Sequence, residues 1–283
     1  MYNLRVTNNQ PTEVSMIKFS KGNVKLQRLK SVPALAQYFT KTGRSTKKVY
    51  SFDLLSGFSC PFADKCKSKV VQINDKRKVV DGANCEFRCF SASQEATYTN
   101  VYNLRKGNFD AMRSIKNTSG MVKLLNDNLP KDAGIVRIHV AGDMFNQRYF
   151  DAWMLVAAAN PNVLFYAYTK SLRYWVDRLG NGVDTFNVIP DNFVLTASRG
   201  GREDHLINQY NLREAVVVYS EAEAASHGYE IDHDDSHAAD PTKRNESFAL
   251  LIHGIQPKGS EAAESIKKLK SDGVEFAYSK KGG

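Results

Sequence analysis

The chain has 283 residues, and its 42% hydrophobic and 24% charged residues are typical of a globular protein that buries a full core. It contains no apolar run of about eighteen residues, the length that marks a membrane span, and its N-terminus lacks the basic-then-apolar order of a signal peptide. We therefore expect no membrane partner and a cytoplasmic location. The net charge of +9 arises in residues 1–80, which carry sixteen Lys and Arg against four Asp and Glu.

Residues 1–47 are predicted to form a basic N-terminal extension, and residues 48–283 a single barrel-like domain. The basic stretches "KTGRSTKK" (41–48) and "KSK...KRK" (67–78) could attract phosphate-rich partners such as nucleic acid. A solvated lysine surface is the favoured interpretation, because no aromatic-spaced recognition motif accompanies the charge. Conversely, residues 221–240 hold seven acids and no Lys or Arg, and "IDHDDSHAAD" within them is expected to form a polar surface loop.

Beyond the extension, the pattern alternates between strands and helices. A first strand is expected at 48–55 and a long helix at about 101–126. From residue 135 onward, apolar runs alternate five times with segments of helical spacing, beginning with "IVRIHVAGD" and "NQRYFDAWMLVAAANP". Successive strand-then-helix units pair in parallel through right-handed crossovers. The predicted fold is therefore α/β, a partial or closed parallel (β/α) barrel, with a doubly wound open sheet as the alternative.

Polar residues follow the predicted strands. In parallel barrels, the loops at the carboxyl ends of the strands carry the chemistry, so these residues are expected to converge on one mouth. The residues predicted to bind a cofactor or substrate there are His139, Gly142, Asp143, Thr169, Lys170, Ser198 and Arg199, and His253 stands at the last strand end. The segment "SRGG" (198–201) offers backbone N–H groups and a cation to an anionic ligand. Each residue also has an ordinary explanation as a helix cap, a turn or a core histidine.

All four cysteines, Cys60, Cys66, Cys85 and Cys89, lie within one eighth of the chain. In a reducing compartment, clustered thiols are more often metal ligands or catalytic groups than disulfides. Their spacing is C-x5-C and then C-x3-C, without the C-x2-C knuckles that are typical of a zinc ribbon. An iron-sulfur cluster accepts wider spacing, because its irons are spread over a cube and each needs one thiolate. We therefore predict a [4Fe-4S] cluster, with zinc as the less favoured alternative.

Cysteines after the first strand of a parallel barrel suggest the radical-SAM architecture, in which three thiolates leave one iron open for S-adenosylmethionine. The chain departs from that class because it lacks C-x3-C-x2-C, although "VAGDMF" (140–145) stands where those enzymes hold the methionyl amine. The chain more closely resembles an uncharacterised bacteriophage protein family, and it matches that family's motifs over about 57–256 as "SCPFADKC", "FRCFSAS", "RIHVAGDMF", "YFDAW", "NPNVLFYAYTKS" and "LTASRGG". The resemblance implies a radical-SAM-like barrel with a cysteine-bound cluster, in the cytoplasm of an infected host cell.

The resemblance carries over Cys60, Cys66 and Cys89 more firmly than Cys85, so the ligand set stays open. With three ligands, the fourth iron accepts S-adenosylmethionine, a substrate or a side chain such as His139, and the protein is a radical-SAM-like enzyme. With four ligands, the protein is a non-catalytic iron-sulfur protein for redox sensing, electron transfer or macromolecule binding. A zinc-stabilised nucleic-acid-binding protein is the third hypothesis.

Overall fold

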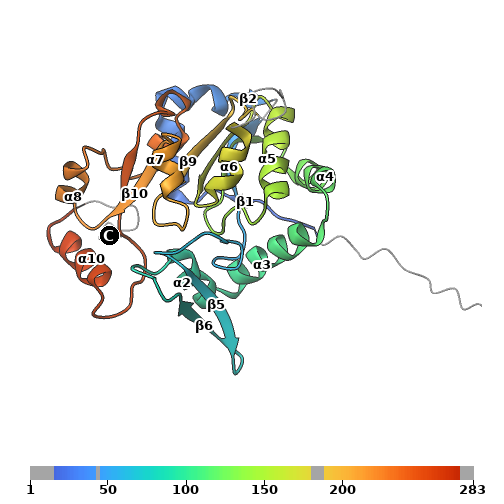
Figure 1. Cartoon of the computed structure of the whole chain (residues 1–283). Helices are drawn as coiled ribbons and strands as arrows, with labels where there is room; N and C mark the ends of the chain where they lie inside the picture. Colours follow the sequence, from blue (N-terminus) through green and yellow to red (C-terminus); the bar gives the residue numbers. More distant parts are fainter. Residues whose placement is uncertain (1–15, 43–44, 180–187, 275–283) are drawn as a thin grey trace, which may run out of the picture.

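The computed structural model describes residues 16–42, 45–179 and 188–274, and a seven-stranded sheet forms their centre (Figure 1). In spatial order its strands are β1 (Ser20–Lys21), β4 (Lys48–Phe52), β7 (Ala133–Ile138), β8 (Leu164–Thr169), β9 (Phe193–Ser198), β10 (Glu214–Val218) and β11 (Phe248–Leu251). Strand β1 is antiparallel to β4, and every other neighbouring pair is parallel. The predicted α/β class with a parallel sheet is confirmed.

The spatial order of the strands follows their order in the chain. In a doubly wound sheet, by contrast, the first strands are added toward one edge of the sheet and the later strands toward the other edge. Within the described residues, β11 pairs with β10 and no ladder joins it to β1. The structure therefore shows a mostly parallel open-ended sheet of the kind that a partial barrel contains, and closure into a full barrel is not shown.

A helix follows each of the last five strands, as predicted. These helices are α5 (Gln147–Ala159), α6 (Leu172–Leu179), α7 (His205–Gln209), α8 (Glu221–Ser226) and α10 (Glu261–Ser271). The single helix expected near 101–126 is instead two helices, α3 (Thr99–Ser114) and α4 (Thr118–Asn128). The break has a local cause, because the Asn117 side chain accepts the Gly120 N–H at 2.7 Å and starts a new helix.

Two apolar cores cover the two faces of the sheet. Neighbouring residues of a strand point to opposite faces, so Ile135 joins one core and Val136 the other. Helices α4, α5 and α6 cover the Val136 face. The Ile135 face receives buried leucines from α1 (Val24–Gln27), η1 (Arg28–Ser31) and η2 (Pro33–Phe39). Part of the basic N-terminal segment is thus built into the sheet core.

A β-hairpin projects from the body of the molecule (Figure 1). It consists of β5 (Ser68–Ile73) and β6 (Lys76–Asp81), joined by Asn74 and Asp75, both with positive φ, and it is followed by α2 (Phe90–Thr97). The remaining short elements are β2 (Lys41–Thr42), β3 (Ser45–Thr46), α9 (Ser236–Ala239) and η4 (Pro241–Lys243). The hairpin matters for the site because Cys66 precedes it and Cys85 and Cys89 follow it. Its strands pair from end to end, with Ser68 opposite Asp81, so the segments on either side of the hairpin lie next to each other.

Candidate functional site

A cavity of about 190 Å³ lies at the carboxyl ends of the parallel strands. Six of the seven residues predicted to bind a cofactor or substrate line it, namely His139, Gly142, Asp143, Thr169, Lys170 and Ser198. His253, after the last strand, lines it too, whereas Arg199 does not. The strand ends therefore meet at one mouth, as the parallel pairing predicted.

Three of the four cysteines line the same cavity, and the fourth does not. Cys60, Cys66 and Cys89 form part of the wall and lie close enough for each to act electrostatically on the others. The thiol of Cys85 is instead 3.2 Å from the Phe87 carbonyl oxygen, to which it donates. No group of three or more His, Cys, Asp or Glu in the described parts of the chain is arranged to hold a metal ion. The predicted [4Fe-4S] cluster thus stays a prediction.

Burial governs the protonation of these thiols. It raises the pKa of Cys89 to about 11, and the nearby Cys66 adds to the shift. It also raises the pKa of Cys60, together with the charges of Asp143 and the two neighbouring thiols. In the metal-free chain both thiols are therefore protonated at neutral pH.

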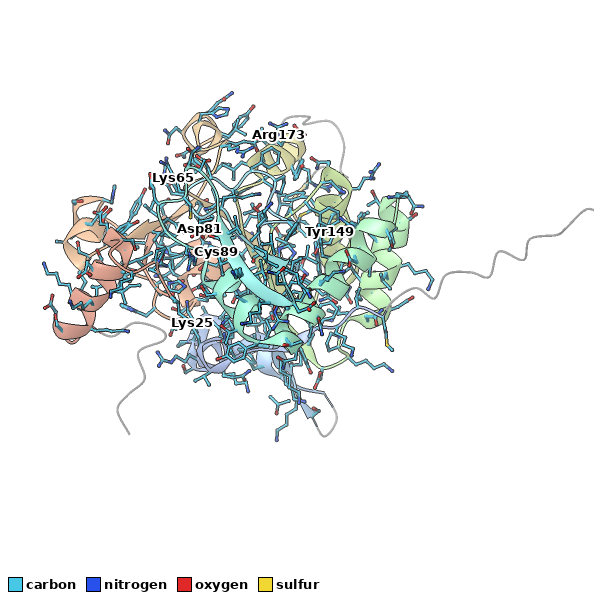
Figure 2. All side chains as sticks on the ribbon, turned by 90° about the horizontal axis from the view of Figure 1, so that it is seen from below. Lys25, Lys65, Asp81, Cys89, Tyr149 and Arg173 are labelled. Carbon is cyan, nitrogen blue, oxygen red and sulfur yellow. The ribbon has the colours of Figure 1, made fainter. Side chains whose placement is uncertain are left out.

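Figure 2 views the molecule from the side on which the hairpin projects, with Cys89 near the centre.

The loop before Cys60 packs against the end of β7 without space between them. Ser59 is fully buried, donates from Oγ to the Leu55 carbonyl at 2.8 Å, and accepts the Asp143 N–H at 3.3 Å. Gly142 has a φ of +93°, and a Cβ added there would lie 2.6 Å from Ser59 Oγ. Only glycine therefore allows both this backbone conformation and this close approach.

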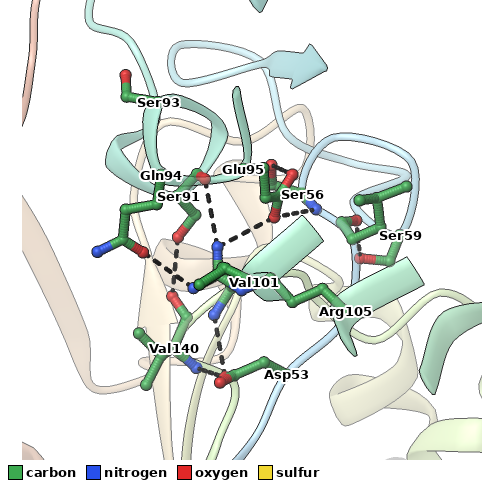
Figure 3. Close-up of polar contacts among 12 residues, drawn as sticks. Asp53, Ser56, Ser59, Ser91, Ser93, Gln94, Glu95, Val101, Arg105 and Val140 are labelled. Atoms are coloured by element: carbon green, nitrogen blue, oxygen red, sulfur yellow. Dashed lines mark hydrogen bonds and ion pairs between the residues drawn. The ribbon is translucent and has the colours of Figure 1, made fainter. Parts of the chain in front are cut away.

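Two buried carboxylates connect segments near the cavity, and one of them joins segments next to the cysteines (Figure 3). Asp53 accepts the N–H of Val140 at 2.7 Å, which ties the end of β4 to the end of β7. Glu95, on the helix that follows Cys89, accepts from the N–H and the Oγ of Ser56 and from the guanidinium of Arg105. The loop before Cys60 and the helix after Cys89 are thus held to each other through buried polar contacts.

Asp143 and Lys170 hold neighbouring strand ends together. The Asp143 carboxylate accepts from Thr169 Oγ1 at 2.6 Å and from the Lys170 N–H at 2.9 Å. Burial raises the pKa of Asp143, while these donors oppose that rise. Lys170 Nζ donates to the carbonyl and Oγ of Ser198 and to the carbonyl of Arg199, at 2.7–2.8 Å. Both side chains position the loops after β7, β8 and β9.

The family model described as Gene product 88 matches residues 17–272. The chain belongs to the gene product 88 family. This match confirms the resemblance to a family of phage gene products, whereas the radical-SAM-like barrel and the cluster stay predictions. No curated protein and no solved structure matches the chain. In the part of the chain that the structure describes, no helix is long and apolar enough to span a membrane.

In this gene product 88 chain, the "SRGG" segment does not present its N–H groups to the cavity. The N–H groups of Gly200 and Gly201 donate to the two carboxylate oxygens of Asp204 at 2.8 and 2.9 Å. Arg199 pairs with Glu214. The backbone N–H groups expected to bind an anionic ligand therefore bind the Asp204 carboxylate instead. The sequence indicated this, because Asp204 lies four residues after Gly200.

The prediction of a polar surface loop at "IDHDDSHAAD" was wrong, because Asp232, Asp235 and Asp240 are all buried. Asp235 pairs with Lys25 at 2.7 Å and with Arg137. Burial alone would raise its pKa, but the charges of Arg137 and Lys25 outweigh burial and lower the pKa of Asp235 to about 2. The acidic segment of this chain thus enters the core because cations from distant parts of the chain compensate it.

Two histidines of the cavity wall are neutral near pH 7. Burial lowers the pKa of His139 to about 3 and that of His253 to about 4. His139 Nε2 is 2.9 Å from the Tyr149 hydroxyl, and among the described residues its Nδ1 has no hydrogen-bond partner. His139 therefore lines the cavity with a neutral imidazole, whose buried Nδ1 has unused hydrogen-bonding capacity.

Proposed function

We propose that the chain binds a [4Fe-4S] cluster through Cys60, Cys66 and Cys89 and acts as a radical-SAM-like enzyme at the cavity. The observation that carries this proposal is the division among the thiols, since three line one cavity while Cys85 donates to the Phe87 carbonyl. Three ligands leave one iron open for S-adenosylmethionine or a substrate. Such a cluster, when bound, supplies one-electron reduction of the ligand at that iron.

The donor chemistry of the site fits this group. Thiolates are soft ligands that favour iron-sulfur clusters, and a thiol must lose its proton to ligate. Burial disfavours the bare thiolates of Cys60 and Cys89, so a cationic iron core would stabilise the charged form that burial penalises. Ala63, Phe87 and Phe90 line the same cavity and supply the apolar shield that keeps water from such a site.

The chain's other residues position the loops rather than bind iron in this proposal. Lys67 Nζ donates to the Gly57 carbonyl at 2.8 Å and to the Cys60 carbonyl, and so fixes the loop that carries the first thiol. Asp143 and Lys170 hold three strand ends in register around the cavity. His139 contributes a neutral imidazole to the cavity wall in this proposal.

A second candidate is a closed, non-catalytic cluster with Cys85 as the fourth ligand. Cys85 favours it in one respect, because its thiol lies near enough to Cys66 for an electrostatic interaction. For this thiol to ligate, it would have to leave the Phe87 carbonyl and turn toward the cavity.

Anaerobic reconstitution with iron and sulfide separates these candidates. We expect a visible iron-sulfur absorption band, an EPR signal after reduction, and a change in that signal on adding S-adenosylmethionine. Cys60→Ser, Cys66→Ser and Cys89→Ser should each lose iron, whereas Cys85→Ser, the matched control, should keep its full complement. Loss of iron in Cys85→Ser would favour the closed cluster, and stoichiometric zinc without a chromophore would overturn both iron proposals.

A further inference from the structure

The hairpin of β5 and β6 turns one face toward the body of the molecule and the other toward solvent. Directly opposed residues of an antiparallel pair lie on the same face, and successive residues of a strand alternate between the faces. The register of the hairpin, with Lys69 opposite Val80, therefore assigns three residues of each strand to the outer face. These residues are Lys69, Val71, Ile73, Lys76, Lys78 and Val80. Three lysines and three aliphatic residues thus make up the outer face of the hairpin.

The inner face anchors the hairpin to the helices beneath it. Val70 is buried there. Arg77 donates to the Glu95 carbonyl at 2.9 Å and to Thr99 Oγ1 at 2.7 Å. The Arg77 guanidinium also stacks on the Tyr102 ring, 5.4 Å from its centroid. These contacts hold the hairpin against α2 and α3, so its outer face is already oriented and loses little conformational entropy when a partner binds.

The outer face carries positive charge that the described part of the chain does not neutralise. All three of its lysines are exposed, and among the described residues none of them pairs with a carboxylate. The cations that flank the hairpin differ, because Lys65 pairs with Glu86 and Arg88 pairs with Asp81. The acids of the hairpin itself are Asp81, which lies on the inner face, and Asp75, which lies in the exposed turn. At least two positive charges therefore remain after the charge of Asp75 is counted.

Apolar side chains lie between and beside these lysines. Ile73 and Val80 are 42% and 41% exposed, and the half-buried Val71 lies between them on the same face. The Phe58 ring, 45% exposed, lies next to Lys69, whose Nζ is 5.5 Å from its centroid. Lysines that only keep the edges of a hairpin solvated do not need such neighbours. Exposed apolar side chains that lie together, rather than singly, are typical of an interaction surface.

The shape of the hairpin fits the major groove of duplex DNA. The hairpin projects from the body, and within the described residues neither of its strands pairs with a further strand (Figure 1). Its strands of 6 residues span about 20 Å, the length of about six base pairs, and a two-stranded ribbon fits a groove about 12 Å wide. Single-stranded nucleic acid is bound instead by aromatic rings that stack on the bases, and β5 and β6 contain no aromatic residue.

We propose that the outer face of the hairpin binds duplex DNA, with Lys69, Lys76 and Lys78 at backbone phosphates and the aliphatic side chains at base edges in the major groove. A lysine that neutralises a phosphate releases condensed counter-ions, and an aliphatic group can contact the thymine methyl. These lysines belong to the basic stretch 67–78, for which the sequence left a phosphate-rich partner as an alternative. The inference goes beyond the proposed function and does not rest on it, because no residue of the outer face lines the cavity.

Fluorescence anisotropy with a labelled duplex of about 20 base pairs measures this binding in the full chain, without iron. Three phosphate contacts predict a slope of about −2.7 for log Kobs against log[KCl], so the affinity should fall about 40-fold between 50 and 200 mM salt. The hairpin variant, which combines Lys69→Gln, Lys76→Gln and Lys78→Gln, should lose nearly all of this slope. Lys78→Gln alone should reduce the slope by about 1 and weaken binding about tenfold at 50 mM salt.

A control variant separates the effect of this face from the effect of net charge. It combines Lys116→Gln, Lys123→Gln and Lys267→Gln, which are exposed lysines outside the hairpin. The control variant loses the same net charge as the hairpin variant and should bind the duplex like the wild-type chain. Lys→Arg exchanges at the three hairpin positions keep the charge and should retain the slope.

Three results would overturn the proposal. The first is no measurable binding of the duplex by the wild-type chain. The second is equal affinity in the hairpin and control variants, which would show that the hairpin lysines only keep it solvated. The third is tighter binding of a single strand of the same length, or of polyglutamate, than of the duplex, which would assign the face to another partner. Loss of the cysteine ligands should leave duplex binding unchanged, so this proposal and the proposed function fail separately.

Discussion

Replacement of Glu95 by glutamine tests whether one buried carboxylate holds the cysteine loops together. Glu95 is fully buried, and the side chain of its partner Arg105 is 6% exposed. Glutamine keeps the shape and can still contact the Ser56 N–H and hydroxyl. The change therefore removes the charge and leaves the Arg105 guanidinium buried beside a neutral amide.

The expected loss of stability follows from this burial. Removing one partner of a buried ion pair costs about 3–5 kcal/mol, because the remaining charge stays desolvated. Since glutamine keeps part of the hydrogen bonding, we expect a value near the lower end, about 3 kcal/mol. The exposed pair Lys123–Asp127 is the matched control, and Asp127→Asn should cost only about 0.5 kcal/mol or less.

Urea denaturation of the wild-type chain and the variants measures these differences in the free energy of unfolding. Glu95→Gln with Arg105→Gln should cost less than the sum of the two single changes, because neither charge then remains alone. Alkylation of Cys60 and Cys89 should also become faster in Glu95→Gln, since their segments lose a connection. A loss below about 1 kcal/mol, the size of an exposed pair, would refute the reasoning.

Three other predictions concern the same region. Gly142→Ala should destabilise the chain by about 3 kcal/mol or more through backbone strain and clashes with Ser59 Oγ and Leu54 Cβ, whereas Gly228→Ala, with φ of +70° but open space, should cost about 1 kcal/mol. His139 and His253 have folded pKa values below the ordinary 6.5, so the unfolded state binds more protons below that pH and stability falls on acidification. Each histidine should contribute a slope of about 1.4 kcal/mol per pH unit to the free energy of unfolding between about pH 4 and 6. His253→Gln should therefore reduce this slope, measured by urea denaturation at several pH values. An unchanged slope would contradict the lowered pKa of His253. Asp204→Ala should cost about 1–3 kcal/mol in the same assay because it leaves the Gly200 and Gly201 N–H groups without their acceptor, and no loss would show that water replaces it.

The sheet was predictable because its strands are apolar runs and its helices repeat with helical spacing. Both faces of a parallel sheet are covered, so Ile135 and Val136 can both be apolar and the whole run stands out in the sequence. The same pairing rule predicted that His139, Asp143 and Lys170 would meet at one mouth. The hairpin was not predicted, because its strands carry several lysines and are only partly buried, and so do not form apolar runs.

The buried ion pairs of Asp235 could not be predicted from local patterns. Asp235 and Arg137 are 98 residues apart, and Lys25 lies in a segment that was expected to be an extension. A carboxylate in an acidic stretch is normally exposed. Asp235 is buried because the fold places the cations Lys25 and Arg137 beside it, and they offset the cost of desolvating its charge. Asp204 was missed for the opposite reason, since its role is local but depends on a turn that the sequence does not specify.

The hairpin that separates the cysteines has a practical consequence for studying the molecule. It leaves the body near Cys66 and returns near Cys85, and its two strands pair with each other and not with the seven-stranded sheet. Its tip, Asn74 and Asp75, is exposed and does not line the cavity. Loop tips of this kind tolerate insertions. A fluorophore or affinity tag inserted between Asn74 and Asp75 would therefore report on the thiol region from outside, without competing for the space that a ligand needs.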